Sequence, residues 1–69
     1  MDVIEIFGAE YAIDWDRLPR GGSFFLPTTA TPQQVQGKLR SAAHRLQYGL
    51  VARARCEYGV YGVRVWRTY

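Results

Sequence analysis

The segment "TPQQVQGKLRSAAHRLQYG", residues 31–49, has the clearest helical periodicity in the sequence, so the other elements are placed around it. Thr31 can accept a hydrogen bond from the backbone of Gln34 while the Gln34 side chain reaches back to Thr31. A proline suits the first helical position, and Gly49 is typical of a left-handed C-terminal cap. We therefore predict a helix over residues 32–48. Its apolar stripe consists of Val35, Leu39, Ala42, Ala43 and Leu46.

After this helix, alternation of residues predicts a β-hairpin. One face of its first strand carries Leu50, Ala52, Ala54 and Cys56, and the other carries Val51, Arg53, Arg55 and Glu57. "YGVYG", residues 58–62, predicts the loop. In the second strand, Val63 and Val65 share one face, while Arg64, Trp66 and Thr68 share the opposite one. Small side chains on the first inner face would let the helix lie close to the sheet.

Before the helix, three short apolar segments predict strands. "VIEIF" covers residues 3–7, "YAIDW" covers residues 11–15, and "FFLP" covers residues 24–27. The second would place its two aromatic residues and its isoleucine on one face. Asp2 and Glu5 are interpreted as solvated charges. The expected order is β(β)–β–α–β–β, an α+β fold with a single helix packed on a small antiparallel sheet.

The length of 69 residues indicates one small domain over residues 1–69. A domain of this size has marginal stability unless a disulfide, a metal or self-association supports it. Cys56 is the sole cysteine and His44 the sole histidine, so we expect no intramolecular disulfide, structural zinc or cofactor. A homodimer is the default expectation. The composition lacks a leader-like or membrane-spanning apolar run, which favours a cytoplasmic protein that does not contact a membrane.

The net charge of +3 hides an uneven distribution along the chain. Residues 1–35 contain five acidic and two basic side chains, whereas residues 36–69 contain seven basic side chains and one acidic. This asymmetry indicates an anionic partner for the second half. The alternative is that the two halves neutralise each other across a dimer.

The arginine-rich face of the hairpin is the candidate site, and nucleic acid is its leading ligand. Arginines suit phosphates, and a tryptophan can stack on an unpaired base. The predicted contacts are Arg53, Arg55, Arg64, Trp66 and Arg67, with secondary basic contacts from Lys38, Arg40 and Arg45. Regular alternation puts Arg67 on the Val65 face, so it would have to reach round the edge. The sequence leaves open DNA or RNA, and a single or a double strand.

Other interpretations of the same face stay open. Trp66 could cap the edge of the core with arginines stacked on it as cation–π pairs. Tryptophan, tyrosine and arginine are also enriched at protein interfaces, so the face could bind a host protein or form the dimer contact. The acidic N-terminal segment could act as a nucleic-acid mimic towards such a partner. A structural or assembly role, in which the dimer is the function, is the third possibility.

Catalysis is not expected. His44 has no carboxylate three or four residues away to orient it, and Ser23, Ser41 and Cys56 would have to share this one histidine. Two acidic residues flank the first tryptophan, but a hard cation requires ~6–8 oxygen ligands. We therefore predict neither an enzyme nor a metal site.

Two segments, "IDWDRLPRGGSFFLP" (residues 13–27) and "GVRVWRTY" (residues 62–69), resemble those of small bacteriophage-encoded proteins of uncharacterised function. The shared pattern is D-W/F-D-x-L, then G-x-SFF-V-P, a helix with alanines and basic residues, and a terminal G-V-R-V-W-R. Matching positions are Asp14, Trp15, Leu18, Gly22, Ser23, Phe24, Phe25, Pro27, Gly62, Val63, Arg64, Val65, Trp66 and Arg67. Leu26 replaces the usual valine, a second glycine precedes the serine, and residues 1–10 lie outside the pattern.

This resemblance implies a phage origin, a helix-on-sheet domain and a place of action inside the host cell. It brings no established activity. Small phage proteins commonly bind DNA or RNA or modulate a host enzyme, and both expectations for the arginine-rich face agree with that background.

Overall fold

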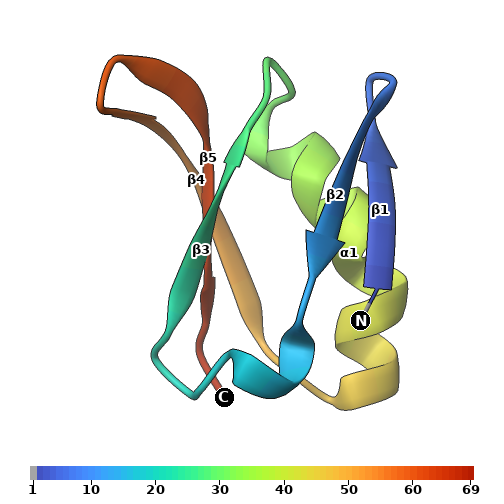
Figure 1. Ribbon diagram of the computed structural model, residues 1–69. Helices are drawn as coiled ribbons and strands as arrows, with labels where there is room; N and C mark the ends of the chain where they lie inside the picture. The colour runs from blue at the N-terminus through green and yellow to red at the C-terminus, as the bar shows by residue number, and fades with distance from the viewer. Residues whose placement is uncertain (1) are drawn as a thin grey trace.

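Residues 2–69, which the computed structural model describes, contain five strands and one α-helix in the predicted order. The predicted α+β class is confirmed (Figure 1). The elements are β1 (Asp2–Ile6), β2 (Ala9–Ile13), a short 3-10 helix η1 (Trp15–Arg17), β3 (Ser23–Pro27), α1 (Pro32–Leu46), β4 (Leu50–Glu57) and β5 (Val60–Arg67). No helix in this part of the chain is long and apolar enough to cross a membrane.

The strands form two antiparallel sheets. β1 and β2 make a two-stranded hairpin, and the other three strands make a sheet of order β3–β5–β4. β5 is therefore the central strand, pairing Phe24 with Val65 on one side and Ala52 with Val65 on the other. In Figure 1, α1 and the β1–β2 hairpin lie on one side of the three-stranded sheet. This arrangement leaves the sheet with one inner and one outer face.

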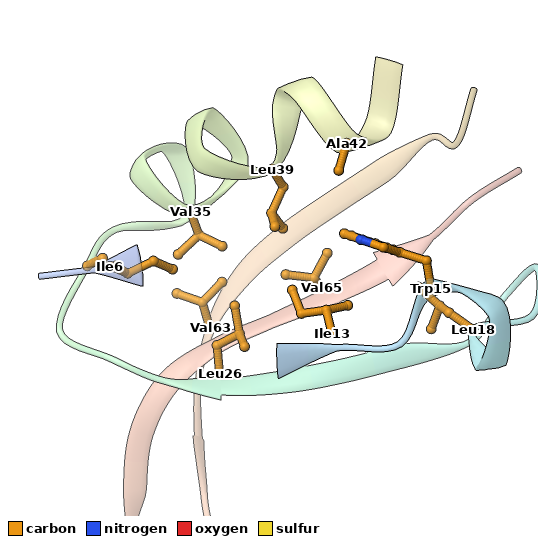
Figure 2. Packing of buried hydrophobic residues seen from close by; sticks show 11 residues of the cluster. Ile6, Ile13, Trp15, Leu18, Leu26, Val35, Leu39, Ala42, Val63 and Val65 are labelled. Atoms are coloured by element: carbon orange, nitrogen blue, oxygen red, sulfur yellow. The ribbon is translucent and has the colours of Figure 1, made fainter. Parts of the chain in front are cut away.

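The core fills the space between the inner face of the sheet, the helix and the hairpin (Figure 2). Val63 and Val65 are fully buried, as are Val35 and Leu39 from α1, because apolar positions at sheet and helical spacing meet there. Among residues 2–69, the buried hydrophobic side chains are Ile6, Ile13, Trp15, Leu18, Leu26, Ala30, Val35, Leu39, Ala42, Val63 and Val65. The two β5 valines, predicted to share one face, lie on the inner face in one cluster with Val35 and Leu39.

The start of α1 follows the prediction, but its end does not. Thr31 and Gln34 form both hydrogen bonds of the capping box, at 3.2 and 2.9 Å. The helix ends at Leu46, and Gln47 takes the left-handed conformation with φ of 57°, so the prediction of Gly49 as cap was wrong. Gly49 lies against the C-terminal residues instead: a Cβ there would lie 2.3 Å from the hydroxyl oxygen of Thr68, so the C-terminal side chains would have to move.

Trp15 departs from the predicted strand. β2 ends at Ile13, and the chain turns into η1 so that the Trp15 ring enters the core, where it packs edge-on against Phe24 and Tyr48. Its Nε1 donates to Asp2 at 2.8 Å. Asp2 is therefore a structural acceptor, and its interpretation as a solvated charge was wrong. A buried indole N–H requires a partner, and only the fold brings this carboxylate to it.

The far half of the β4–β5 hairpin leaves the core. Ala54 and Cys56 lie on the inner side but are exposed, contrary to the prediction that they pack under the helix. Figure 1 shows the hairpin turn curling away from α1. Tyr58 at the turn is fully exposed, and Tyr61 is 56% exposed. The helix therefore covers the beginning of β4 and leaves the turn in solvent.

Candidate functional site on the outer face of the sheet

The outer face of the three-stranded sheet brings together several of the predicted site residues. Arg53 pairs directly with Arg64, and Val51 pairs with Trp66, so these four side chains share one face. Arg55, two residues beyond Arg53, lies on the same face. These side chains share a face because alternate residues of a strand point to the same side and because directly paired residues of β4 and β5 do so as well.

A shallow groove of about 550 Å³ crosses this face. We call it the Arg/Trp groove; its lining residues are Arg20, Gly21, Val51, Arg53, Arg55, Trp66, Arg67 and Thr68. The Trp66 ring is half-buried, and the guanidinium carbon of Arg55 lies 5.2 Å from its centroid. This is a cation–π contact at an open site, where such contacts contribute ~0.5–1 kcal/mol. One of the alternative interpretations was that arginines stack on Trp66, and Arg55 does so inside the groove.

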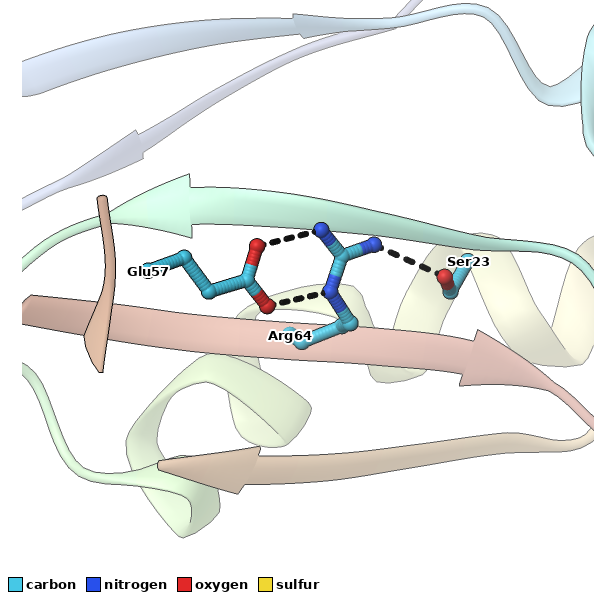
Figure 3. Close-up of polar contacts among 3 residues, drawn as sticks. All are labelled: Ser23, Glu57 and Arg64. Atoms are coloured by element: carbon cyan, nitrogen blue, oxygen red, sulfur yellow. Dashed lines mark hydrogen bonds and ion pairs between the residues drawn. The ribbon is translucent and has the colours of Figure 1, made fainter. Parts of the chain in front are cut away.

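Arg64 is held by neighbours in the sheet. Its guanidinium donates two hydrogen bonds of 2.6 Å to the Glu57 carboxylate and one of 2.8 Å to Ser23 (Figure 3). It also lies 5.8 Å from the Phe25 ring centroid. These hydrogen bonds hold the pKa of Glu57 below its ordinary value, against the opposing effect of desolvation. The charge of Arg64 is neutralised, which leaves it poorly placed for phosphate.

Arg67 is held on the other face, as alternation predicts. Its guanidinium stacks 3.6 Å from the Tyr48 ring centroid and donates to the backbone oxygens of Leu18, at 2.8 Å, and Tyr69, at 3.1 Å. It does not reach round the edge with its charged group. Arg67 therefore lines the groove at its edge, but its guanidinium group packs on Tyr48 at the end of the core.

Arg20 was missed by the sequence analysis. Backbone hydrogen bonds join Gly21 and Gly22 to Arg67, at 2.7 and 2.9 Å, and pin the β2–β3 loop beside the end of β5. This pinning carries the exposed Arg20 to the groove. Its neighbours in sequence predict a turn but give no signal for where that turn lies.

The predicted secondary contacts lie on α1, away from the groove. Arg45 forms an ion pair of 2.5 Å with Asp2, and this hydrogen bond lowers the pKa of Asp2. Lys38 and Arg40 are exposed. The three residues are therefore not brought together with the candidate site.

Three arginines of the groove carry charge that is not neutralised. Among residues 2–69, salt bridges are formed by Arg17, Arg45 and Arg64, and by no other cationic side chain. Arg20, Arg53 and Arg55 thus lie around Trp66 and Val51 without a salt bridge, and Arg55 stacks on the Trp66 ring. Such a groove can attract an anionic group and offer an apolar platform beside it.

The acidic and metal-ligating residues form no comparable site. In the described part of the chain, no group of three or more His, Cys, Asp or Glu side chains could hold a metal ion. His44 lies on the exposed side of α1 in a separate hollow with Arg40 and Tyr48.

Comparisons with protein-family models, curated proteins and solved structures found no match to this chain. The resemblance to small phage proteins accordingly stays a prediction. Function must be inferred from the geometry of the groove.

Proposed function

We propose that the Arg/Trp groove binds single-stranded nucleic acid, with arginines on the phosphates and Trp66 against an unpaired base. The observation that carries this proposal is the presence of three unneutralised arginines around a half-buried tryptophan in one groove. Phosphate contacts supply most of the affinity of such surfaces, and base–aromatic stacking adds ~1–3 kcal/mol per base.

The spacing of the cations suits an extended strand. Arg53 and Arg55 are two residues apart on β4, hence about 6.6 Å apart along the strand. This is comparable to the separation between successive phosphates of an extended polynucleotide. Arg20 belongs to the β2–β3 loop, whose glycines hydrogen-bond to Arg67 next to Trp66, and it lines the same groove, so it adds a third cation near the ring.

An unpaired base is favoured over a duplex by the shape of the surface. The groove lies on a sheet face, and Trp66 is half-buried in it rather than projecting outward. A base must leave its duplex stack before it can lie against such a ring. Arg55 already lies over the indole, so a bound base would displace it or share the ring with it.

The test is a fluorescence titration with short oligothymidylate, the abasic analogue of equal length, and a duplex. Oligothymidylate should bind most tightly and quench tryptophan emission, because Trp66 stacks while Trp15 is buried. The abasic strand should bind more weakly and quench less. Trp66→Phe should leave the emission of Trp15 unresponsive.

Salt dependence and a matched pair of variants test the site itself. Three phosphate contacts predict a log–log salt slope of about −2 for a single strand. Arg53→Ala/Arg55→Ala should weaken binding at least tenfold and flatten the slope by about 1.4. Lys38→Ala/Arg40→Ala removes the same charge from α1 and should change binding far less. Equal losses in both double variants would exclude the groove as the site.

A protein partner is the second candidate. The hairpin turn exposes Tyr58 fully, Tyr61 by 56% and Val60 by 44%, and such side chains suit an interface with a host protein. Binding through them would depend weakly on salt and would survive Arg53→Ala/Arg55→Ala. On the phage resemblance alone, we propose the host cytoplasm as the place of action for either candidate.

A further inference from the structure

The outer face of the β1–β2 hairpin exposes apolar and acidic side chains together. Its residues, which we call the outer hairpin face, are Val3, Glu5, Glu10 and Ala12, and Phe7 adjoins them in the turn between the two strands. Val3 is 62% and Phe7 66% exposed, although the opposite side of this hairpin packs into the core. Two large apolar side chains on one short hairpin form a surface that a partner could cover.

The two acidic side chains of this face lie side by side. Glu5 lies directly opposite Glu10 in the β1–β2 register, and like charges in that position repel. Within residues 2–69, neither glutamate forms a salt bridge. A partner with cations among apolar side chains would therefore neutralise the two carboxylates and also bury the exposed apolar side chains.

The Arg/Trp groove has the complementary composition. It places Val51 and Trp66 among Arg20, Arg53 and Arg55, all three unneutralised. The outer hairpin face places Val3 beside two carboxylates, with Phe7 in the adjoining turn. Each surface thus supplies the charge that the other lacks, and both are formed by strands with one face turned outward.

One molecule cannot join its own two surfaces. The inner sides of the hairpin and of the three-stranded sheet both pack into the core, so their outer faces point away from each other (Figure 1). The complementary surface must come from another molecule. The same complementarity is visible in the sequence, because the acidic residues are concentrated in the first half, which forms the hairpin, and the basic residues in the second half, which forms most of the groove.

We propose that the outer hairpin face of one copy docks into the Arg/Trp groove of the next copy. The contact is heterologous, since two different surfaces meet, and it joins copies head to tail. Each added copy leaves one free hairpin face and one free groove. The hairpin carboxylates occupy the groove in place of phosphate, so association competes with nucleic acid while not depending on nucleic-acid binding.

The first measurement is sedimentation velocity of nucleic-acid-free protein over a concentration series. At low ionic strength the average mass should rise continuously with concentration beyond that of a dimer. At high salt the association should weaken at least tenfold, because the charges meet at a surface. A protein that stays monomeric at low salt throughout the series would overturn the proposal, as would a closed dimer indifferent to salt.

Charge reversal gives the decisive test. Glu5→Lys/Glu10→Lys sets lysines against arginines, and Arg53→Glu/Arg55→Glu sets glutamates against glutamates, so each variant alone should be monomeric. In an equimolar mixture both kinds of contact become attractive, and association should return. Failure of the mixture to associate, with both variants folded by circular dichroism, would overturn the proposal.

The matched control reverses two charges outside both surfaces. Lys38→Glu/Arg40→Glu changes the net charge as much as the groove variant does but lies on α1. It should associate by itself as the wild type does. Loss of association in this control would assign the effect to net charge and overturn the specific contact.

Discussion

The two faces of the three-stranded sheet differ in what their residues do, although the same strands form both. On β5, Val63 and Val65 are fully buried, while the intervening Arg64 and the following Trp66 face outward. Inner residues are in contact with the helix and hairpin, so their shape and polarity determine stability. Outer residues are free to carry charge. Stability and surface chemistry are therefore separable on neighbouring positions of one strand.

The largest difference between the faces should come from the same substitution made on each. Val63→Asp places a carboxylate among apolar side chains, which should cost more than ~3 kcal/mol and unfold so small a domain. Val51→Asp, on the outer face where the valine is 37% exposed, should cost about 1 kcal/mol or less. Thermal melting followed by circular dichroism would show this, and similar melting temperatures for both variants would contradict the distinction.

Gly62 tests how tightly the outer face itself is packed at the centre of the sheet. A Cβ at Gly62 would lie 2.3 Å from the backbone oxygen of Leu26 and 2.6 Å from the Phe25 ring. Gly62→Ala should therefore destabilise by ~1–3 kcal/mol in urea unfolding. Gly37→Ala, on the helix with open space around it, should instead stabilise by ~0.5–1 kcal/mol. A stabilising Gly62→Ala would show that the strands can separate there.

The Glu57–Arg64 pair should give the outer face a smaller, pH-dependent contribution. Hydrogen bonds from Arg64 hold the pKa of Glu57 below its ordinary value of 4.5, so the unfolded chain binds more protons in that range. The stabilisation is complete above 4.5 and is lost as the pH falls through the lower folded pKa. Glu57→Gln should remove this part of the acid sensitivity.

Urea unfolding at several pH values would measure that effect. The stability difference between wild type and Glu57→Gln should shrink as the solution is acidified. Acid sensitivity that remains in the variant is expected from Asp2, whose pKa is lowered by Arg45. A difference that grows towards acid would contradict the assignment to Glu57.

The smallest effect on stability should come from the free arginines. Arg53→Ala/Arg55→Ala should change the free energy of unfolding by no more than ~1 kcal/mol, since both side chains are exposed, neither forms a salt bridge, and the contact of Arg55 with Trp66 lies at an open site. The same variant should show the largest loss of nucleic-acid binding. A strongly destabilised double variant would make these arginines structural and erase the separation between the faces.

Much of the fold could be predicted, because local patterns carried it. The capping box and the apolar stripe located α1, and alternation placed the β5 valines inside and Trp66 outside. The errors were made where a distant segment decided the outcome. Gln47 takes the left-handed cap position, while Gly49 is hydrogen-bonded to the C-terminal residues. Cys56 is exposed because the helix does not extend over the far half of β4.

The candidate site divides in the same way. Alternation alone determined that Arg53, Arg55, Arg64 and Trp66 share a face, since side chains of a strand point to its two sides in turn. Which of these charges remain free was decided by tertiary structure. Arg64 meets Glu57 across the hairpin, and Arg20 arrives from a loop pinned to β5. Ion pairs form between side chains that are close in space, whereas a single sequence shows only which residues are close along the chain.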